Sequence, residues 1–271
     1  MLVLSMNPKQ KYGPTALVTG ASSGIGEAFA RELAEAGFRV ILVARRTDLL
    51  DKLAHDIESI PGAEALVISA DLGKTEDVDR LLEAVESEEI GLFVSSAGFG
   101  SSGPFETLSV DSEVDMVRVN CEATVQLTHA IGSKMLHRKR GGVVLIASLL
   151  GWQGVPGTAT YSATKGFVQC FAEALHTEWK PGGVDVISCA PGPVLSQFDS
   201  RANMTISNGV TPETVARQTL AALGKRTTVI PGALSKFLSF ALLHCPRALR
   251  VAILKKVMDG LTNYGKPHTG R

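Results

Sequence analysis

The chain has 271 residues, of which 45% are hydrophobic, and its 27 basic side chains balance 27 acidic ones. The balance excludes a global field that would recruit nucleic acid or an anionic surface. The hydrophobic fraction indicates a substantial buried core, and the length fits one large α/β domain over residues 1–271.

The spacing of cysteines and histidines argues against metal sites and disulfides. Cys121, Cys170, Cys189 and Cys245 are scattered without a C-x-x-C pair, and the six histidines are equally dispersed. We therefore expect no metal, and we interpret the cysteines as core residues in a reducing compartment. Residues 1–10 hold too short an apolar stretch for a signal peptide, and no run reaches the roughly 18 apolar residues of a membrane span. These features predict a soluble, cytoplasmic protein.

A glycine turn follows the first predicted strand. Residues 15–19 are largely apolar, as in a buried parallel strand, and the helix after the turn carries Phe29 and Leu33 on one stripe. Strand, glycine turn and helix in this order make a phosphate site, because glycines let the backbone approach and the helix N-terminus offers unpaired N–H groups. The residues predicted to bind a cofactor here are Gly20, Ser22, Ser23, Gly24, Ile25 and Gly26.

Two motifs together indicate a family. The spacing Thr19-Gly20-x-x-x-Gly24-Ile25-Gly26 departs from the G-x-G-x-x-G fingerprint, and no P-loop lysine follows it. Further along, a predicted helix contains Tyr161-x-x-x-Lys165. With these motifs the chain resembles the short-chain dehydrogenase/reductase family over roughly residues 13–200. The resemblance implies an oxidoreductase that binds a nicotinamide dinucleotide.

Two arginines follow the second predicted strand, residues 40–43. A dinucleotide fold that prefers NAD places an acid about twenty residues beyond the glycine turn, but this chain has Ala44, Arg45 and Arg46 there. An arginine fork suits a 2′-phosphate, so we expect Arg45 and Arg46 to bind NADP(H). The alternative is that both are ordinary loop cations.

The third predicted strand, residues 65–68, ends near Asp71 and Leu72. The resemblance implies that Asp71 bonds the adenine amino group of the cofactor. The alternative is that Asp71 caps the helix that begins near Thr75.

The fourth predicted strand, residues 92–94, leads into small residues. The resemblance implies that Ala97 and Gly98 let the cofactor pass over the end of the sheet. Ser95 and Ser96 stand where the family usually has two asparagines, and their shorter side chains leave their own roles open.

A long helix is predicted over residues 109–137, with Asn120 inside it. A buried amide in an apolar helix must be paired. Asn120 either ties the helix to a neighbour or, as the resemblance implies, holds a water on the proton path to Lys165. The cations at the end of this helix, Lys134 and residues 138–140, are expected to be exposed.

The fifth predicted strand, residues 143–147, delivers Ser148 at its carboxyl end, where ligands of open parallel sheets gather. Thirteen residues later come Tyr161 and Lys165, one helical turn apart. Because a nearby cation favours the phenolate, we expect Lys165 to lower the pKa of Tyr161 towards working pH. The resemblance implies that Ser148 holds the substrate oxygen, Tyr161 exchanges a proton, Lys165 bonds the nicotinamide ribose, and Asn120 completes the catalytic set.

The sixth predicted strand, residues 184–188, leads into a proline- and glycine-rich turn. The sequence there matches the family pattern Pro-Gly-x-Val-x-Thr, with Ser196 in place of the threonine. The resemblance implies that Val194 binds the nicotinamide amide and that Pro191, Gly192 and Ser196 also contact the cofactor. Tight-turn chemistry alone would also explain Pro191 and Gly192.

The C-terminal part resembles the family least. Residues 197–209 are polar and rich in turn formers, and we expect a mobile lid over the substrate. Thr211 is expected to cap a helix, and a seventh strand is expected at residues 228–230. The apolar stretch and basic helix of residues 237–258 are interpreted either as a packing or oligomer-contact element or as an apolar substrate mouth on a membrane surface.

Alternating strands and helices predict an α/β fold, a Rossmann-like, doubly wound parallel sheet of about seven strands with helices on both faces. We expect an NADP(H)-dependent enzyme that interconverts a carbonyl and a secondary alcohol on an apolar substrate, such as a 3-oxoacyl or steroid-like ketone, with residues 197–271 around that substrate. A homodimer or homotetramer is expected, and nucleic acid is not a predicted partner. The alternatives are a non-enzymatic NADP(H)-binding regulator and, with a poorer match in glycine spacing, a sugar-nucleotide epimerase.

Overall fold

Seven parallel strands form the centre of the molecule. The structure is a computed structural model that describes residues 8–195 and 209–261. The strand order is β3-β2-β1-β4-β5-β6-β7. The chain therefore builds outward from β1 in one direction and then returns to build in the other, and a crevice forms at such a switch point. The strands are β1 Thr15–Thr19, β2 Arg39–Ala44, β3 Glu64–Ser69, β4 Ile90–Ser95, β5 Gly141–Ile146, β6 Val184–Cys189 and β7 Thr228–Val229.

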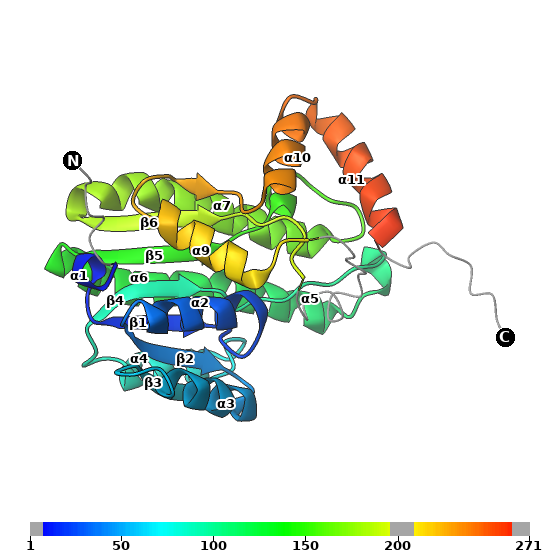
Figure 1. Cartoon of the computed structure of the whole chain (residues 1–271). Helices are drawn as coiled ribbons and strands as arrows, with labels where there is room; N and C mark the ends of the chain where they lie inside the picture. The colour runs from blue at the N-terminus through cyan, green and yellow to red at the C-terminus, as the bar shows by residue number, and fades with distance from the viewer. Residues whose placement is uncertain (1–7, 196–208, 262–271) are drawn as a thin grey trace, which may run out of the picture.

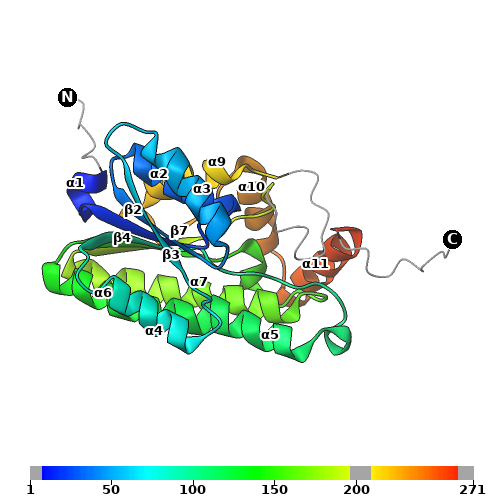
Figure 2. The same ribbon diagram turned by 90° about the horizontal axis from the view of Figure 1, so that it is seen from below.

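Helices cover both faces of the sheet (Figure 2). On one face α2, α3 and α9 pack on one set of alternating strand residues, among them Val18 and Leu42. On the other face α6 and α7 pack on the opposite set, among them Leu17 and Ile41. The helices before residue 195 are α1 Pro8–Tyr12, α2 Gly24–Glu35, α3 Thr47–Glu58, α4 Thr75–Ala84, α5 Val110–Val117, α6 Ala123–Arg138 and α7 Ala159–Trp179.

The predicted doubly wound parallel sheet is confirmed, and all seven of its strands start and end within two residues of the prediction. The fifth strand needs a correction, because β5 begins at Gly141 and Ala147 lies beyond its end. Gly141 and Gly142 are buried strand residues and not part of an exposed turn. A Cβ on Gly141 would lie 2.5 Å from Cγ of Met135 on α6, so a glycine lets this helix cross the strand closely.

The long helix predicted over residues 109–137 is continuous but changes its winding. A π-helical turn, Arg118–Glu122, separates α5 from α6. Ser109 caps the start of α5, and Lys139, in the left-handed conformation, ends α6. A π turn often marks a functional position in a helix, and this one contains Asn120.

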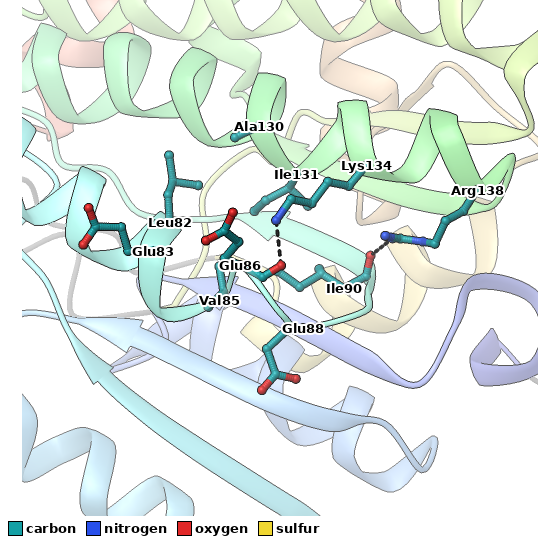
Figure 3. A pocket seen from close by; sticks show the side chains of 10 residues that line it. All are labelled: Leu82, Glu83, Val85, Glu86, Glu88, Ile90, Ala130, Ile131, Lys134 and Arg138. Carbon is teal, nitrogen blue, oxygen red and sulfur yellow. Dashed lines mark hydrogen bonds between the residues drawn. The ribbon is translucent and has the colours of Figure 1, made fainter.

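The basic end of α6 is attached to the protein as well as exposed. Lys134 Nζ donates to the backbone oxygen of Glu86 at 2.8 Å, and Arg138 Nη2 donates to that of Ile90 at 2.7 Å. Figure 3 shows both side chains beside a small pocket between the ends of α4 and α6, at the start of β4. These cations therefore fasten α6 to the turn before β4, and they were expected only to be exposed.

The C-terminal helices stand over the carboxyl edge of the sheet (Figure 1). Thr211 caps α9 by accepting a hydrogen bond from the backbone N–H of Thr214, as predicted. After β7 the chain forms a helical hairpin of α10 and α11. The predicted basic helix is confirmed as α11, and the apolar stretch before it is the helix α10. The predicted lid over residues 197–209 lies outside the described residues except for Gly209. The remaining helices are α9 Pro212–Ala222, α10 Ala233–Leu243 and α11 Arg247–Leu261.

Candidate active site

A cleft of about 410 Å³ opens where the strands end. It brings together most of the residues predicted for cofactor and catalysis, although they come from all parts of the chain up to residue 194. Asn120 lies behind its wall, and Ser196 lies outside the described residues. The predicted residues that line the cleft are Gly20, Ser22, Ser23, Gly24, Ile25, Gly26, Arg45, Arg46, Asp71, Leu72, Ala97, Gly98, Ser148, Tyr161, Lys165, Pro191, Gly192 and Val194.

The glycine turn leaves no space for side chains at its centre. Gly20 and Gly24 adopt φ angles of 69° and 59°, which favour glycine. A Cβ on Gly26 would lie 2.3 Å from the backbone oxygen of Gly20. Ser23 precedes α2 without making a side-chain cap, so no side chain of the cap residue occupies the first amides of the helix. The turn is thus a backbone cradle of the kind that accepts a pyrophosphate.

Arg46 is fixed at one end of this cradle. Its Nη2 donates to the hydroxyl oxygens of Ser22 and Ser23, at 3.0 Å in each case. Arg45 also lines the cleft but is exposed. A guanidinium flanked by two hydroxyls is a donor set that suits a phosphate group. The description as an ordinary loop cation therefore does not fit Arg46.

Asp71 does not cap the next helix. Its carboxylate accepts from the backbone N–H of Gly73 at 3.2 Å, while α4 begins after Lys74 without a side-chain cap. Instead, the Asp77 carboxylate in the first turn of α4 accepts a hydrogen bond from the backbone N–H of Asp71 at 2.8 Å. The alternative prediction for Asp71 is wrong for this reason, and its side chain remains at the cleft.

Thr19 is a structural residue that the sequence analysis did not single out. Its hydroxyl oxygen accepts from the backbone N–H groups of Ser96 and Ala97, both at 3.1 Å. It thereby joins the end of β1 to the loop after β4, where a Cβ on Gly20 would lie 2.8 Å from the nitrogen of Ala97. The sequence offers one indication of this role, because Thr19 stands directly before Gly20 in the glycine motif.

The two serines that replace asparagines face different surroundings. The Ser95 hydroxyl is buried against that of Thr124 on α6, 3.1 Å away, and so points away from the cleft. Ser96 lines the cleft. The replacement at position 95 therefore serves helix packing.

Asn120 is held by three side-chain hydrogen bonds in the π turn. Its Nδ2 donates to the backbone oxygen of Phe99 and to Oγ1 of Thr164, both at 3.0 Å. Its Oδ1 accepts from the backbone N–H of Phe99 at 3.1 Å. A Cβ on Gly98 would lie 2.9 Å from Asn120 Oδ1 and 3.5 Å from Lys165 Nζ, so the two side chains meet at this glycine. The predicted pairing of the amide is confirmed, and it ties α6 to α7 directly beside Lys165.

Ser148, Tyr161 and Lys165 lie together in the deepest part of the cleft. Ser148 follows β5 in an extended conformation, accepts from the backbone N–H of Leu150 at 3.2 Å, and is hydrogen-bonded to the phenol of Tyr161. Lys165 Nζ donates to the backbone oxygen of Ile146 at 2.8 Å and lies 5.8 Å from the centre of the Tyr161 ring. All three side chains are buried.

Burial governs the protonation of this group. It raises the pKa of Tyr161 to about 12, against the opposing hydrogen bond with Ser148, and it lowers the pKa of Lys165 to about 8. Burial therefore opposes the predicted lowering of the Tyr161 pKa by Lys165, whose ammonium donates to the backbone oxygen of Ile146 in this geometry. At neutral pH the phenol is protonated and can donate its proton.

The helical hairpin forms the other wall of the cleft. Every residue that it contributes is apolar, and the buried members Leu254 and Met258 pack against Val155. A large substrate group that enters the cleft would therefore meet only apolar side chains on the hairpin. The contributing residues are Leu238, Leu242, Ile253, Leu254, Val257 and Met258.

Among residues 8–195 and 209–261, no group of histidines, cysteines and acids is placed to hold a metal ion, and no helix is long and apolar enough to cross a membrane. All four cysteines are free thiols.

Comparison with known proteins gives consistent matches. The family model described as short chain dehydrogenase matches residues 14–206. A very-long-chain 3-oxoacyl-CoA reductase from Anas platyrhynchos is 36% identical over 217 residues, which cover 78% of this chain and 69% of that protein. A 7beta-hydroxysteroid dehydrogenase from Clostridium sardiniense is 32% identical over 238 residues, covering 85% and 90% of the two chains.

Among solved structures, a short-chain dehydrogenase from Sphingobium yanoikuyae in complex with NADPH superposes with a TM-score of 0.76. The sequence identity is 26%, and the match covers 95% of this chain and 98% of that one. The similarity therefore extends beyond the glycine turn to the C-terminal helices.

Proposed function

The chain belongs to the short-chain dehydrogenase/reductase family, and from this premise we propose that its cleft interconverts a bulky apolar ketone and the corresponding secondary alcohol. The protein is an NADP(H)-dependent oxidoreductase acting on CH–OH and C=O groups. The single observation that carries the substrate proposal is the contrast between the two walls. Ser148 and Tyr161 lie on one, and only apolar side chains of α10 and α11 lie on the other.

The residues of the cleft fit NADP(H), which supplies or accepts a hydride when bound. We assign the pyrophosphate to the Gly20–Gly26 cradle and the amides of α2. Arg46, with Ser22 and Ser23, suits the 2′-phosphate, because these three side chains already form one cluster of donors. Asp71 is assigned to the adenine and the backbone of Val194 to the nicotinamide amide.

The catalytic roles follow from position and protonation. Ser148 is assigned to orient the substrate oxygen, because its hydroxyl adjoins the phenol. Tyr161 donates the proton in reduction and accepts it in oxidation. Lys165, when charged, stabilises the phenolate that remains after donation. Asn120 holds the loop at Phe99 and the helix next to Lys165, so its side chain acts here as a positioning group.

The substrate class is narrowed by the apolar wall and by the relatives. One relative is named for very-long-chain 3-oxoacyl-CoA and another for a hydroxysteroid. Both names point to a ketone on a large apolar body, which the hairpin can cover. The non-enzymatic regulator is disfavoured, because the relatives are named as a reductase and a dehydrogenase.

A panel of ketones tests this proposal. NADPH oxidation would be followed with ketosteroids, 3-oxoacyl thioesters of increasing chain length and short water-soluble ketones. We expect kcat/KM to rise with apolar size, because each buried methylene contributes about 0.8 kcal/mol. Equal kcat/KM for short and bulky ketones would contradict the assignment of the hairpin to the substrate.

Assembly and location are further proposals. We infer one domain over residues 1–271, with 197–271 on the substrate side, and a homodimer or homotetramer in the cytoplasm with peripheral membrane contact through the C-terminal helices. Oligomerisation is supported by Val110, Val114 and Val117 on α5, which are exposed apolar residues on one helix. Light scattering on the purified protein tests the assembly, and a monomer would contradict it.

A further inference from the structure

Helix α10 buries its two serines and exposes its two phenylalanines. Ser235 and Ser239 are 4% and 3% exposed, whereas Phe237 and Phe240 are 66% and 65% exposed. The serine face is fixed by close packing, because a Cβ on Gly192 would lie 2.4 Å from the Ser235 hydroxyl oxygen. The usual amphipathic pattern of a surface helix is thus reversed, and the outer face stays exposed although the Phe240 ring lies against His244, with 4.4 Å between the ring centroids.

The exposed apolar surface extends along both helices of the hairpin. Leu234 and Leu243 of α10 and Leu249 of α11 are also about half exposed or more. Single exposed apolar side chains are common, but a contiguous group of this kind marks an interaction site.

The hairpin that carries this surface is basic, and its exposed cations are Lys236, Arg247, Lys255 and Lys256. Between residues 233 and 261 there are five lysines and arginines and a single acid, Asp259, which is paired with Lys255. The whole chain, in contrast, has equal numbers of each sign. An apolar helix face flanked by cations complements an anionic lipid surface, where each basic residue near the surface adds about 1 kcal/mol to binding.

The same helix connects the outer surface to the cleft. At about 100° per residue, Phe237, Leu234, Leu238 and Leu242 follow one another around α10 without a polar side chain between them. Leu238 is partly exposed, and both Leu238 and Leu242 line the cleft. On α11, Ile253 also lines the cleft and is partly exposed.

We propose that the α10–α11 hairpin docks on an anionic lipid bilayer and that α10 guides an apolar ketone from the bilayer into the cleft. The docking gives a surface and a lipid class to the membrane contact proposed above and does not depend on the proposed activity, whereas the guiding role rests on that activity. A second copy of the chain suits this surface less well than a bilayer does. In a two-fold contact the cations of one hairpin would lie near those of the other and repel them.

Vesicle sedimentation tests the docking without using activity. The full chain is mixed with phosphatidylcholine vesicles that contain or lack phosphatidylglycerol. We expect binding to the anionic vesicles, weaker binding at high salt, and a loss of about tenfold or more in Phe237→Ser/Phe240→Ser, whose rings no longer enter the lipid. Phe167→Ser on α7 is the matched control and should bind as the wild type does.

Retained NADPH binding shows that each variant is folded. Unchanged vesicle binding by the double variant, or no binding by the wild type, would overturn the docking. A dimer lost in the double variant, without vesicle binding by the wild type, would assign the surface to a second copy.

A second experiment tests the guiding role. With a long-chain ketone supplied in vesicles, the double variant should reduce the ketone more slowly than the wild type, while its rate with a short soluble ketone stays unchanged. Equal rates in vesicles would overturn the guiding role, and failure on every ketone would count against the proposed function alone.

Discussion

The protonation of individual residues in the cleft depends on burial more than on sequence spacing. The sequence places Tyr161 and Lys165 one turn apart, and the structure confirms that they face the same cleft. Spacing could not show that the Lys165 ammonium is bonded to the backbone oxygen of Ile146. That oxygen belongs to β5, and its position depends on the tertiary packing of α7 against the sheet.

A pH profile tests the charge of Lys165. Its pKa is lowered to about 8 by burial, so the cation that stabilises the phenolate is present below this pH and is lost above it. The kcat/KM for reduction should therefore fall as pH rises through about 8. In Lys165→Arg, which stays charged, this fall should disappear even if the rate is lower. A descending limb at the same pH in the variant would show that another group is responsible.

The two arginines after β2 are expected to differ. Arg46 is bonded to Ser22 and Ser23, whereas Arg45 is exposed. Arg46→Ala should lower kcat/KM with NADPH by about 10- to 100-fold, since hydrogen bonds to charged groups contribute about 1.5–3 kcal/mol. Its kcat/KM with NADH should change little, and Arg45→Ala serves as the control. Equal losses with both cofactors would argue against a 2′-phosphate role.

At the scale of elements, the strands and helices could be predicted, and their irregularities could not. Hydrophobic runs predicted the strands of the sheet, and the cap residue Thr211 predicted the start of helix α9. The π turn at Asn120 escaped prediction because it depends on partners far along the chain, Phe99 and Thr164. The start of β5 at Gly141 likewise depends on the close crossing of α6.

The glycine turn can be tested with one methyl group. In Gly26→Ala the Cβ would lie 2.3 Å from the backbone oxygen of Gly20, so the turn must open. We expect NADPH affinity to fall at least about tenfold and the free energy of unfolding to fall by about 1–3 kcal/mol. Gly154→Ala is the matched control, because nothing lies within 4 Å of its Cβ. Calorimetric titration with NADPH and thermal unfolding measure both effects, and a normal affinity in Gly26→Ala would contradict the cradle.

At the scale of the whole molecule, the overall composition and net charge did not reveal the character of the C-terminal hairpin. The balanced charge of the chain gave no sign that the hairpin is basic, and the composition of α10 could not tell that its phenylalanines face outward. The orientation of α10 depends on its packing against Gly192, whereas the basic character of α11 could be predicted from its local sequence. The doubly wound parallel sheet, in contrast, could be predicted from the alternation of strands and helices.

The end of the sheet opposite the cleft contains a charge cluster that should matter for stability only. Asp185 on β6 accepts from Lys11 and Lys180 at 2.6 Å and from the Tyr12 hydroxyl at 3.0 Å. Burial by itself would raise the pKa of Asp185, but the hydrogen bonds from Lys11 and Lys180 outweigh it and hold the pKa below its ordinary value. The carboxylate thus ties α1 and the end of α7 to the sheet.

Replacing this carboxylate tests its contribution. Asp185→Asn should lower the free energy of unfolding by about 1–3 kcal/mol at neutral pH. Because the folded pKa is lowered, the stabilisation exists above the ordinary aspartate pKa of about 4 and is lost as pH falls below it. The variant and the wild type should therefore converge in urea unfolding as pH falls through the lowered pKa of the folded state, while Asp79→Asn on the exposed side of α4 shows no loss. A difference that persists at low pH would exclude the charge as its cause.

The most direct test of the proposed mechanism is the rate and cofactor affinity of Tyr161→Phe. The phenol is the proton donor in this account, and its removal leaves the cradle and Arg46 in place. We expect kcat for ketone reduction to fall by about a hundredfold or more, while the Kd for NADPH, measured by fluorescence titration, stays within about twofold of the wild type, because the affinity arises elsewhere in the cleft. Turnover by Tyr161→Phe at the wild-type rate would contradict the account.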